Sequence, residues 1–384
     1  MATLDHLTCG RIGWNIVTGY LDSAARAMGL DAQIEHDDRY DLADEYLQVV
    51  YALWESGWAD DAVTRDRKRG TYTNPRRVRQ AHHHGKQFHV DGVPLWEPSP
   101  QRTPVLYQAG ASHRGRVFAA RHAECVFINA STKQNVGRLA ANLRTRAAPR
   151  PMLVFVGANA VTGRSEREAR ELLAEYRRHA SVEGALAHAA ASLGIDFARC
   201  GMDEPIDADP TQAIRSNVEA ITASLGPGWS KRRLIDRFVL GSRQPPIVGS
   251  PEQVANQLIA WVREADVDGF NLSYLSRTVV PECLESFIDL VIPILQERGA
   301  YKRGYAPGTY REKLFGRGDR LPDEPLRRRY AGGNRKRWGR HNRELQHAVR
   351  WQGGFGHGGT ARDRPRDGAR VCCRRRRRRD QLAR

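Results

Sequence analysis

The sequence predicts an α/β fold, and three observations carry that prediction. Ile12 to Thr18 is a short run of apolar, β-branched and aromatic residues closed by Gly19, which is typical of a strand buried on both faces of a parallel sheet. From Pro104 onward, segments typical of strands and of helices alternate. The string VGSPEQVANQLIAWVREADVDGFNL gives the clearest repeat, with Ser250 as N-cap, an amphipathic helix and then a strand. We therefore expect a parallel sheet covered by helices.

Five strands are expected from these patterns: Ile12–Thr18, Pro104–Ala109, Cys125–Asn129, Met152–Gly157 and Gly269–Leu272. The expected helices, from helical spacing and capping residues, are Arg39–Gly57, Arg114–His122, Lys133–Arg146, Ser165–Arg178, Glu183–Leu193, Thr211–Leu225, the helix after Ser250 and Pro281–Glu297. Between Trp58 and Thr103 the alternating stretch Gln87 to Val90, ended by Asp91-Gly92, predicts a hairpin excursion.

The positive charge of the chain is concentrated at its end. The whole sequence has a formal net charge of +17, and residues 326–384 hold 20 Lys+Arg against 4 Asp+Glu. Residues 1–325 keep 41 basic and 40 acidic residues. We therefore divide the chain into a folded α/β domain, 1–325, and a disordered Arg-rich tail, 326–384. A nucleic-acid role would depend on that tail alone, and we expect none for the domain.

Composition also limits compartment and metal chemistry. No apolar run approaches the ~20 residues that span a bilayer, and no signal-peptide pattern opens the chain, so a cytoplasmic protein without membrane contact is expected. Four scattered cysteines, Cys9, Cys125, Cys200 and Cys283, suggest reduced, structural thiols. The cluster of His82, His83, His84 and His89 has no acidic or cysteine partner at ligand spacing, and adjacent side chains of a strand face opposite ways. We expect no metal.

Polar residues mark the mouth of the first strand as a candidate site. Asn15 and Thr18 interrupt that strand near its end, and a buried hydrogen-bonding group needs a partner in the protein or in a ligand. The following loop leads to His36 and Tyr40, which are one helical turn apart and could both reach a phosphate at a helix N-terminus. Ser112 follows another strand, after Gly110 and before a helix. Taken alone, it is better explained as an N-cap than by a phosphate at the helix N-terminus.

Several strings in the same order resemble a known family. GRIGWNIVTGY, HDDRY and QAGAS at 108–112 resemble the bacterial-luciferase-like, two-component flavin-dependent monooxygenases, with the nitrilotriacetate monooxygenase component A family as the nearest branch, which includes dibenzothiophene-sulfone and long-chain-alkane monooxygenases. The resemblance runs from about residue 3 to about 320. It implies a (β/α)8 TIM-barrel fold that binds FMN, supplied in reduced form by a separate NAD(P)H-dependent flavin reductase. It also implies that O2 is used to oxygenate a small organic substrate.

The resemblance also assigns residues to the cofactor. It places His36, Tyr40 and Ser112 at FMN-binding positions, with Asn15 and Thr18 carried over from the strand motif. His84, in HGKQFHVDG, would line the substrate side. No catalytic acid or base is indicated, because the flavin carries the oxygen chemistry. A homo-oligomer is expected from the family.

Five strands are fewer than the eight of a closed barrel. Members of the family begin before GRIGWNIVT, so we expect an incomplete barrel that lacks about the first three βα units and is open at two edges. Two alternatives to an active oxygenase follow. One is a catalytically impaired flavin-binding fragment or pseudoenzyme, and the other is a nucleic-acid-associated protein that acts through the basic tail. The sequence does not define the substrate.

Overall fold

The computed structural model describes residues 1–110, 112–129, 132–206, 221–222, 225–240, 245–273 and 281–322. The chain divides into two compact units. The larger unit comprises residues 14–44 and 106–306, and the smaller comprises 1–13, 45–105 and the chain from 307 onward. The expected tail, 326–384, and most of the expected helix Thr211–Leu225 lie outside the described residues.

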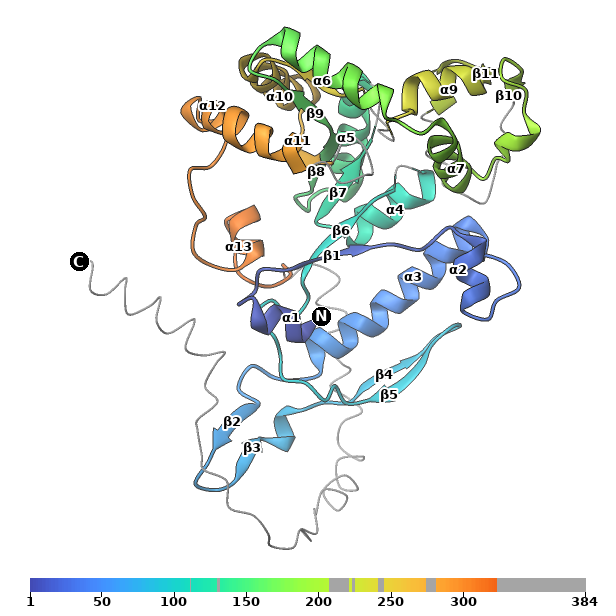
Figure 1. The fold of residues 1–384 in the computed structure, drawn as a ribbon. Helices are drawn as coiled ribbons and strands as arrows, with labels where there is room; N and C mark the ends of the chain where they lie inside the picture. The colour runs from blue at the N-terminus through green and yellow to red at the C-terminus, as the bar shows by residue number, and fades with distance from the viewer. Residues whose placement is uncertain are drawn as a thin grey trace, which may run out of the picture. The chain divides into compact units, whose positions relative to one another are not determined.

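A five-stranded sheet is the centre of the larger unit (Figure 1). Its order is β1-β6-β7-β8-β13, and the pairs from β6 to β13 are parallel. The strands are β1 Gly13–Ile16, β6 Val105–Gln108, β7 Cys125–Ile128, β8 Leu153–Ala158 and β13 Gly269–Leu272. All five predicted strands are therefore confirmed, as is the α/β class. β1 and β13 stand at the two ends of the order, and the incompleteness of the barrel stays a prediction.

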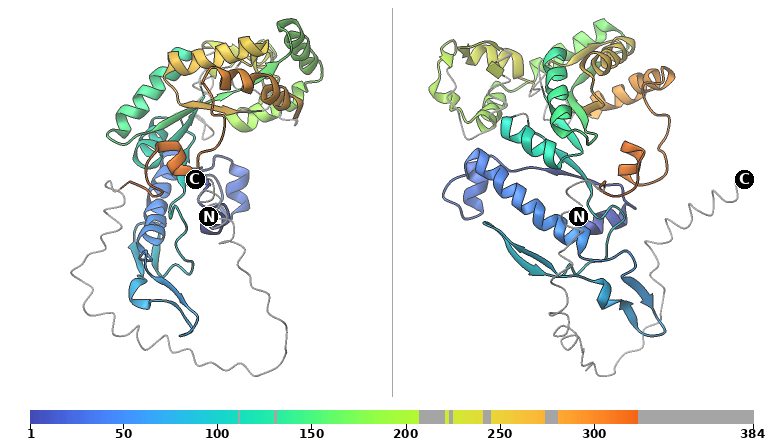
Figure 2. Two further views of the ribbon diagram at one scale, coloured as in Figure 1. Left: turned by 90° about the vertical axis from the view of Figure 1, so that its left-hand side faces the viewer. Right: turned by 180° about the vertical axis from the view of Figure 1, so that it is seen from behind.

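Helices follow the strands in the predicted alternation (Figures 1 and 2). The longer ones are α3 His36–Tyr51, α4 His113–His122, α5 Lys133–Ala147, α6 Glu166–Arg178, α7 Val182–Leu193, α9 Lys231–Phe238 and α10 Pro251–Ala265, and the shorter are α2 Asp22–Ala27, α11 Pro281–Ser286 and α12 Ile292–Glu297. Ser250 and Gln253 form the expected capping box of α10. α3 begins three residues earlier than predicted, so His36 lies in its first turn, where Asp37 and Asp38 favour the helix N-terminus.

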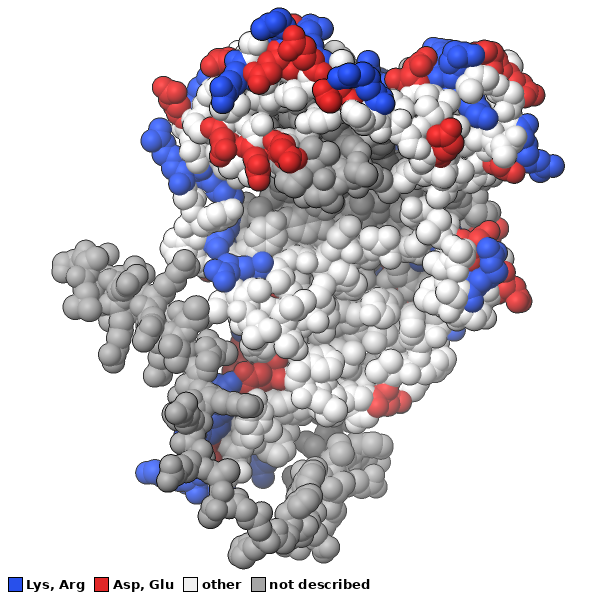
Figure 3. Space-filling view, viewed as in Figure 1, with Lys and Arg blue, Asp and Glu red and all other residues white. Residues whose placement is uncertain are grey.

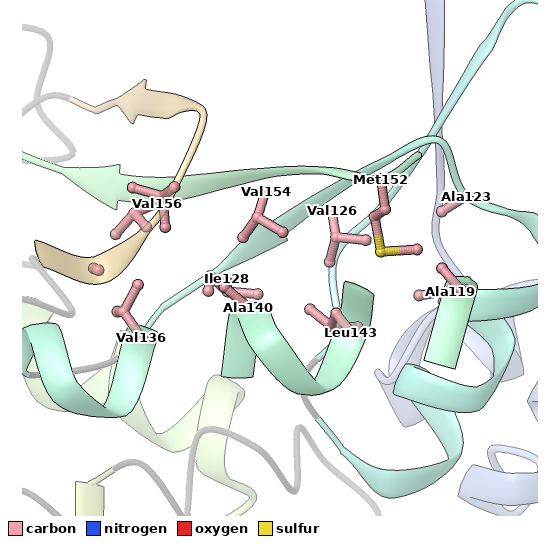
Figure 4. Packing of buried hydrophobic residues seen from close by; sticks show 13 residues of the cluster. Ala119, Ala123, Val126, Ile128, Val136, Ala140, Leu143, Met152, Val154 and Val156 are labelled. Carbon is pink, nitrogen blue, oxygen red and sulfur yellow. The ribbon is translucent and has the colours of Figure 1, made fainter. Parts of the chain in front are cut away.

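One face of the sheet packs against helices and forms the main core (Figure 4). Val126, Ile128, Val154 and Val156 point from β7 and β8 toward Val136, Ala140 and Leu143 of α5, with Ala119 of α4 and Ala265 of α10 completing the cluster. The exposure of these four strand residues is at most 1%. Burial of each contributes about 1.5–3 kcal/mol, which explains why short β-branched runs are sufficient to fix the sheet.

The opposite face of the same strands carries aromatic side chains. Tyr107 of β6 stacks on Phe127 of β7, with ring centroids 5.0 Å apart, and Phe127 lies 6.1 Å from Phe155 of β8. Side chains alternate along a strand, so residues next to the core residues must face away from it. The sheet is thus apolar on both sides, as the unbroken apolar runs of the sequence predicted.

A second parallel pair of strands was not predicted. β9 Ala160–Thr162 follows β8 directly and pairs with β12 Ile247–Gly249, with Ile247 opposite Ala160. Each strand has only three residues, and the pairing joins segments more than eighty residues apart. A three-residue run gives no periodic signal, so only tertiary structure defines these strands.

The last expected helix, Pro281–Glu297, is helical but not uniform. A π-helical turn, Phe287–Val291, separates α11 from α12. Pro293 stands at the start of α12, where a proline removes a backbone donor and disrupts the regular i to i−4 pairing. The local change of hydrogen-bond register is the expected consequence.

The smaller unit contains α1 Ala2–Leu7, the hairpins β2 Val63–Asp66 with β3 Thr71–Thr73 and β4 Ala81–His84 with β5 His89–Gly92, and α13 Tyr310–Phe315. The predicted hairpin is confirmed, but its turn was misplaced. Residues 85–88 make the turn, whereas Asp91 and Gly92 end β5. Glu45 explains the difference, because its carboxylate accepts hydrogen bonds from the backbone N–H of Gln87 at 3.0 Å and of Phe88 at 2.8 Å.

Charged side chains of both signs are interspersed on the outer helices of the larger unit (Figure 3). On α6, for example, Arg170 pairs with Glu166 and Arg178 with Glu175 at helical spacing. This mixture agrees with the balanced charge of residues 1–325. Among the residues described, no helix is long and apolar enough to cross a membrane.

Candidate functional site

Three of the predicted site residues meet in the larger unit. Thr18 follows β1, Tyr40 lies in the second turn of α3, and Ser112 precedes α4. The Tyr40 hydroxyl is within hydrogen-bonding reach of the hydroxyls of both Ser112 and Thr18. These segments are far apart in the sequence and come together where β1 and β6 end, which is where α/β proteins place their ligands.

The Tyr40 phenol is buried, with 6% of its surface exposed. Burial raises its pKa, and the hydroxyls of Ser112 and Thr18 together with the positive charges of Arg39 and Arg114 oppose that shift in part. The phenol is therefore protonated at neutral pH and can donate a hydrogen bond. The two nearby guanidinium groups make the surroundings of its oxygen favourable for an anion.

Ser112 is the N-cap of α4. Its hydroxyl accepts a hydrogen bond from the backbone N–H of Gly115 at 3.1 Å, and 7% of its surface is exposed. The remaining unpaired amides and the helix dipole make such an N-terminus favourable for an anion. The capping role is thus shown, and a phosphate at this helix end stays a prediction.

Two glycines allow polar side chains to lie close to the backbone around the Tyr40 hydroxyl. A Cβ atom on Gly110 would lie 2.8 Å from the Tyr40 oxygen and 2.4 Å from Nε2 of Gln108. A Cβ atom on Gly115 would lie 2.9 Å from both the Tyr40 oxygen and Ser112 Oγ. Any side chain at these two positions would fill the space that the three polar groups share. The absence of side chains here fits a site where a ligand approaches the backbone.

Gln108 adds a buried amide that sequence reasoning did not single out. It is 2% exposed at the end of β6, and its Nε2 lies 3.4 Å from the Tyr40 oxygen. Its Oε1 has no hydrogen-bond partner among the described residues. A buried oxygen without a partner costs about 1–3 kcal/mol, so a hydroxyl-bearing ligand that donates to it would recover that cost. The signal was present in the sequence as a polar residue that ends an apolar strand.

The other predicted residues lie as follows. His36 is 7% exposed, its Nδ1 lies 2.6 Å from Oδ1 of Asp37, and its ring contacts the Tyr40 ring edge-on at 5.3 Å. His36 therefore lies beside Tyr40 at the candidate site. Asn15 is exposed on β1, next to buried Ile16. Because neighbouring strand residues face opposite ways, its side chain does not share the buried side of the strand.

His84 belongs to the smaller unit, where it is exposed on β4. The hairpin register places Asp91 opposite His82, and Asp91 accepts hydrogen bonds from both His82 at 2.6 Å and His84 at 3.0 Å. Our expectation that these histidines have no acidic partner was therefore wrong. The pairing of β4 with β5, rather than the spacing in the sequence, places Asp91 beside His82 and His84. In the described part of the chain, no group of three or more His, Cys, Asp or Glu residues is arranged to hold a metal ion.

An ionic cluster joins α3 to α4 beside Tyr40. Nη2 of Arg114 lies 2.6 Å from carboxylate oxygens of both Asp41 and Asp44, and Nε2 of His122 lies 2.6 Å from the second oxygen of Asp44. Burial opposes ionisation of Asp44, but hydrogen bonds from His122 and Arg114 lower its pKa overall. Burial lowers the pKa of His122 despite this carboxylate. Sequence reasoning missed the cluster because its α3 members and their α4 partners are 70 or more residues apart.

A parallel sheet with alternating helices and a cluster of polar side chains at the strand ends is the arrangement of α/β proteins of the TIM-barrel type. Residues 1–269 match the luciferase-like monooxygenase family, and the chain belongs to that family. Its relatives are named as monooxygenases, which supports a flavin-dependent monooxygenase.

The relatives confirm the resemblance seen in the sequence. The long-chain alkane monooxygenase of Geobacillus thermodenitrificans is 43% identical over 336 residues, which are 86% of this chain and 72% of that protein. Nitrilotriacetate monooxygenase component A of Aminobacter aminovorans is 34% identical over 323 residues, which are 82% and 70%. The crystal structure of riboflavin lyase with modified FMN and riboflavin superimposes with a TM-score of 0.77 at 35% identity, covering 85% of this chain and 73% of that one.

Proposed function

We propose that this chain is the oxygenase of a two-component system that takes reduced FMN from a separate flavin reductase and uses O2 to oxygenate a small organic substrate. One observation carries the proposal: the buried Tyr40 hydroxyl meets Ser112 at the N-terminus of α4, beside two glycines whose Cβ atoms would fill the space. These groups supply hydrogen-bond donors and a helix N-terminus, which a phosphate monoester requires.

The residues present fit FMN in a specific arrangement. Tyr40, Ser112 and His36 would hold the phosphate, with Thr18 fixing the Tyr40 hydroxyl. The Oε1 of Gln108 would accept a hydrogen bond from a hydroxyl of the ribityl chain, since a fully ionised phosphate has no proton to donate to it. Asn15 is assigned to the ring side.

When bound and reduced, the flavin supplies the reaction with O2. The contribution of the chain is to bind and orient the cofactor and to exclude water from the reacting end. The aromatic side chains of Tyr107, Phe127 and Phe155 offer a continuous apolar surface for that purpose. No protein acid or base is assigned a step.

Partners and substrate are inferred from the relatives. A relative named as component A of a monooxygenase supports a separate reductase as partner. Names that specify an alkane in one case and nitrilotriacetate in another support only a small organic substrate. We propose His84 for the substrate side and a homo-oligomer as the working assembly.

The test is FMN binding by the purified full chain, followed through quenching of flavin fluorescence. Ser112→Ala removes the proposed phosphate contact together with a helix cap. Ser165→Ala is the matched control, because Ser165 caps α6 in the same way, accepting from the backbone N–H of Glu168 at 3.2 Å. Ser112→Ala and Tyr40→Phe should each weaken FMN binding about tenfold, corresponding to one hydrogen bond to a charged group, and Ser165→Ala should not.

Turnover separates the oxygenase from its alternative. With a flavin reductase, NADH and FMN, O2 uptake that is coupled to loss of an added organic substrate supports the proposal. Tight FMN binding without coupled uptake across alkane, sulfide and aminopolycarboxylate substrates supports the impaired flavin-binding fragment instead. Failure of the wild-type chain to bind FMN, or equal effects of Ser112→Ala and Ser165→Ala, would refute the site.

A further inference from the structure

Two carboxylates lie unexpectedly close to the proposed phosphate position. Asp41 and Asp44 follow Tyr40 on α3 by one and four residues, and both reach the first turn of α4. A phosphate monoester carries up to two negative charges, so two aspartates near its site oppose its binding. The site needs a positive charge to offset them.

Arg114 is placed to supply that charge. A single guanidinium nitrogen, Nη2, lies 2.6 Å from both Asp41 and Asp44, and the guanidinium carbon lies 5.6 Å from the centroid of the Tyr40 ring. The side chain of Arg114 is 18% exposed, so solvent screens it only in part. Burial raises the pKa of the Tyr40 phenol, and the charge of Arg114 opposes part of that rise, as expected for a cation near the oxygen that would contact the phosphate.

We propose that Arg114 determines the specificity for the phosphorylated flavin, by neutralising Asp41 and Asp44 so that a dianion can bind beside Tyr40 and Ser112. The inference rests on the proposed function, because it concerns the same site. It assigns no phosphate contact to Arg114. Removal of the guanidinium takes this counter-charge from Asp41 and leaves Asp44 with Arg121 and His122. The added negative charge should repel FMN but not riboflavin, since riboflavin has the same ring and ribityl chain without the phosphate.

Arg121 provides a matched control on the same helix. Its Nη1 lies 3.5 Å from Asp44 Oδ1, and its side chain is 42% exposed. Arg121→Gln therefore removes the same charge from the same helix and from the same carboxylate, but two turns away from Ser112. A general loss of positive charge would affect both variants alike, whereas the proposed role concerns Arg114 only.

The experiment measures the dissociation constants of FMN and riboflavin for the full chain and four variants. Arg114→Gln should weaken FMN binding about tenfold and riboflavin binding by less than about twofold, as expected for uncompensated charge near a dianion. Arg121→Gln should leave the ratio of the two constants close to that of the wild type. Adding Asp41→Asn to Arg114→Gln should restore most of the FMN affinity, because it removes one of the carboxylates. The side chain of Asp41 is 70% exposed, so this substitution does not disturb the packing.

The outcomes separate the two proposals. A wild-type chain that binds FMN no better than riboflavin overturns the phosphate site, and with it the role of Arg114. A wild-type preference for FMN that Arg114→Gln leaves intact overturns only the role of Arg114. Equal weakening of both ligands, without rescue by Asp41→Asn, shows that Arg114 is merely structural and also overturns the inference. Arg114→Lys keeps the charge and should keep the preference.

Discussion

Gly110→Ala is the most direct structural test of the site. The added Cβ would lie 2.4 Å from Nε2 of Gln108 and 2.8 Å from the hydroxyl of Tyr40, and both distances are below any normal contact with carbon. Both side chains are buried, at 2% and 6% exposure, so neither can move into solvent without loss of packing. Forcing extra volume into such a place costs about 1–3 kcal/mol.

That cost should appear in ligand binding as well as in stability. If Tyr40 moves to relieve the contact, its hydroxyl leaves Ser112, and FMN affinity falls about tenfold for one lost hydrogen bond to a charged group. Gly304→Ala is the control, because a Cβ there meets nothing within 4 Å. Titration with FMN and thermal unfolding of both variants give the two readouts.

The reasoning fails if Gly110→Ala binds FMN as the wild type does. That result would mean that the space next to Tyr40 is not used by the cofactor. A loss of stability equal in the two alanine variants would refute the packing argument, since only one of them has neighbours within contact distance.

Three further predictions concern stability and the tail. Burial lowers the pKa of His122, so the unfolded chain protonates this imidazole at a higher pH than the folded chain does, and the free energy of unfolding should fall as pH drops below about 6.5. The lowered pKa of Asp44 adds a further loss of stability below about pH 4. In chemical denaturation at a series of pH values, His122→Gln should reduce the pH dependence of stability at about pH 6. Arg311→Ala should destabilise the smaller unit by about 3–5 kcal/mol. The Arg311 side chain is buried at 2% exposure, and its guanidinium donates hydrogen bonds to the carbonyls of Thr103 at 3.0 Å and Asp319 at 2.9 Å. Arg317→Ala, at an exposed position, should cost less than about 0.5 kcal/mol in the same assay. Deletion of residues 326–384 should leave the FMN dissociation constant unchanged, and a large increase would contradict the separation of domain and tail.

Local sequence was sufficient for most of the sheet. The five strands of the order β1-β6-β7-β8-β13 are apolar runs ended by glycine or polar residues, and each can be predicted from its own residues alone. Helix starts with a cap, such as Ser165 and Ser250, were also predicted, because capping acts within four residues. The pairing of β9 with β12 and the turn held by Glu45 depend on contacts across long sequence separations, and no local pattern encodes them.

The site shows the same division. Tyr40 and Ser112 were predicted by motif and by position next to a strand or helix, and the structure brings them together. Their surroundings were not predicted. Gln108 gains its importance from a neighbour 68 residues away, and Arg114 from carboxylates on another helix. The burial of each residue along β1 was also beyond the sequence, since Asn15 is exposed and its neighbour Ile16 is buried.

The two interpretations of Ser112 left open by the sequence turn out to be compatible. A hydroxyl has one proton to donate and two lone pairs that accept, and the cap uses only one lone pair, for the backbone N–H of Gly115. The proton remains for an oxygen atom, which is the Tyr40 hydroxyl in this structure and would be a phosphate oxygen with FMN bound. Helix capping fixes the hydroxyl in place before the ligand arrives, so binding loses little side-chain entropy at this residue.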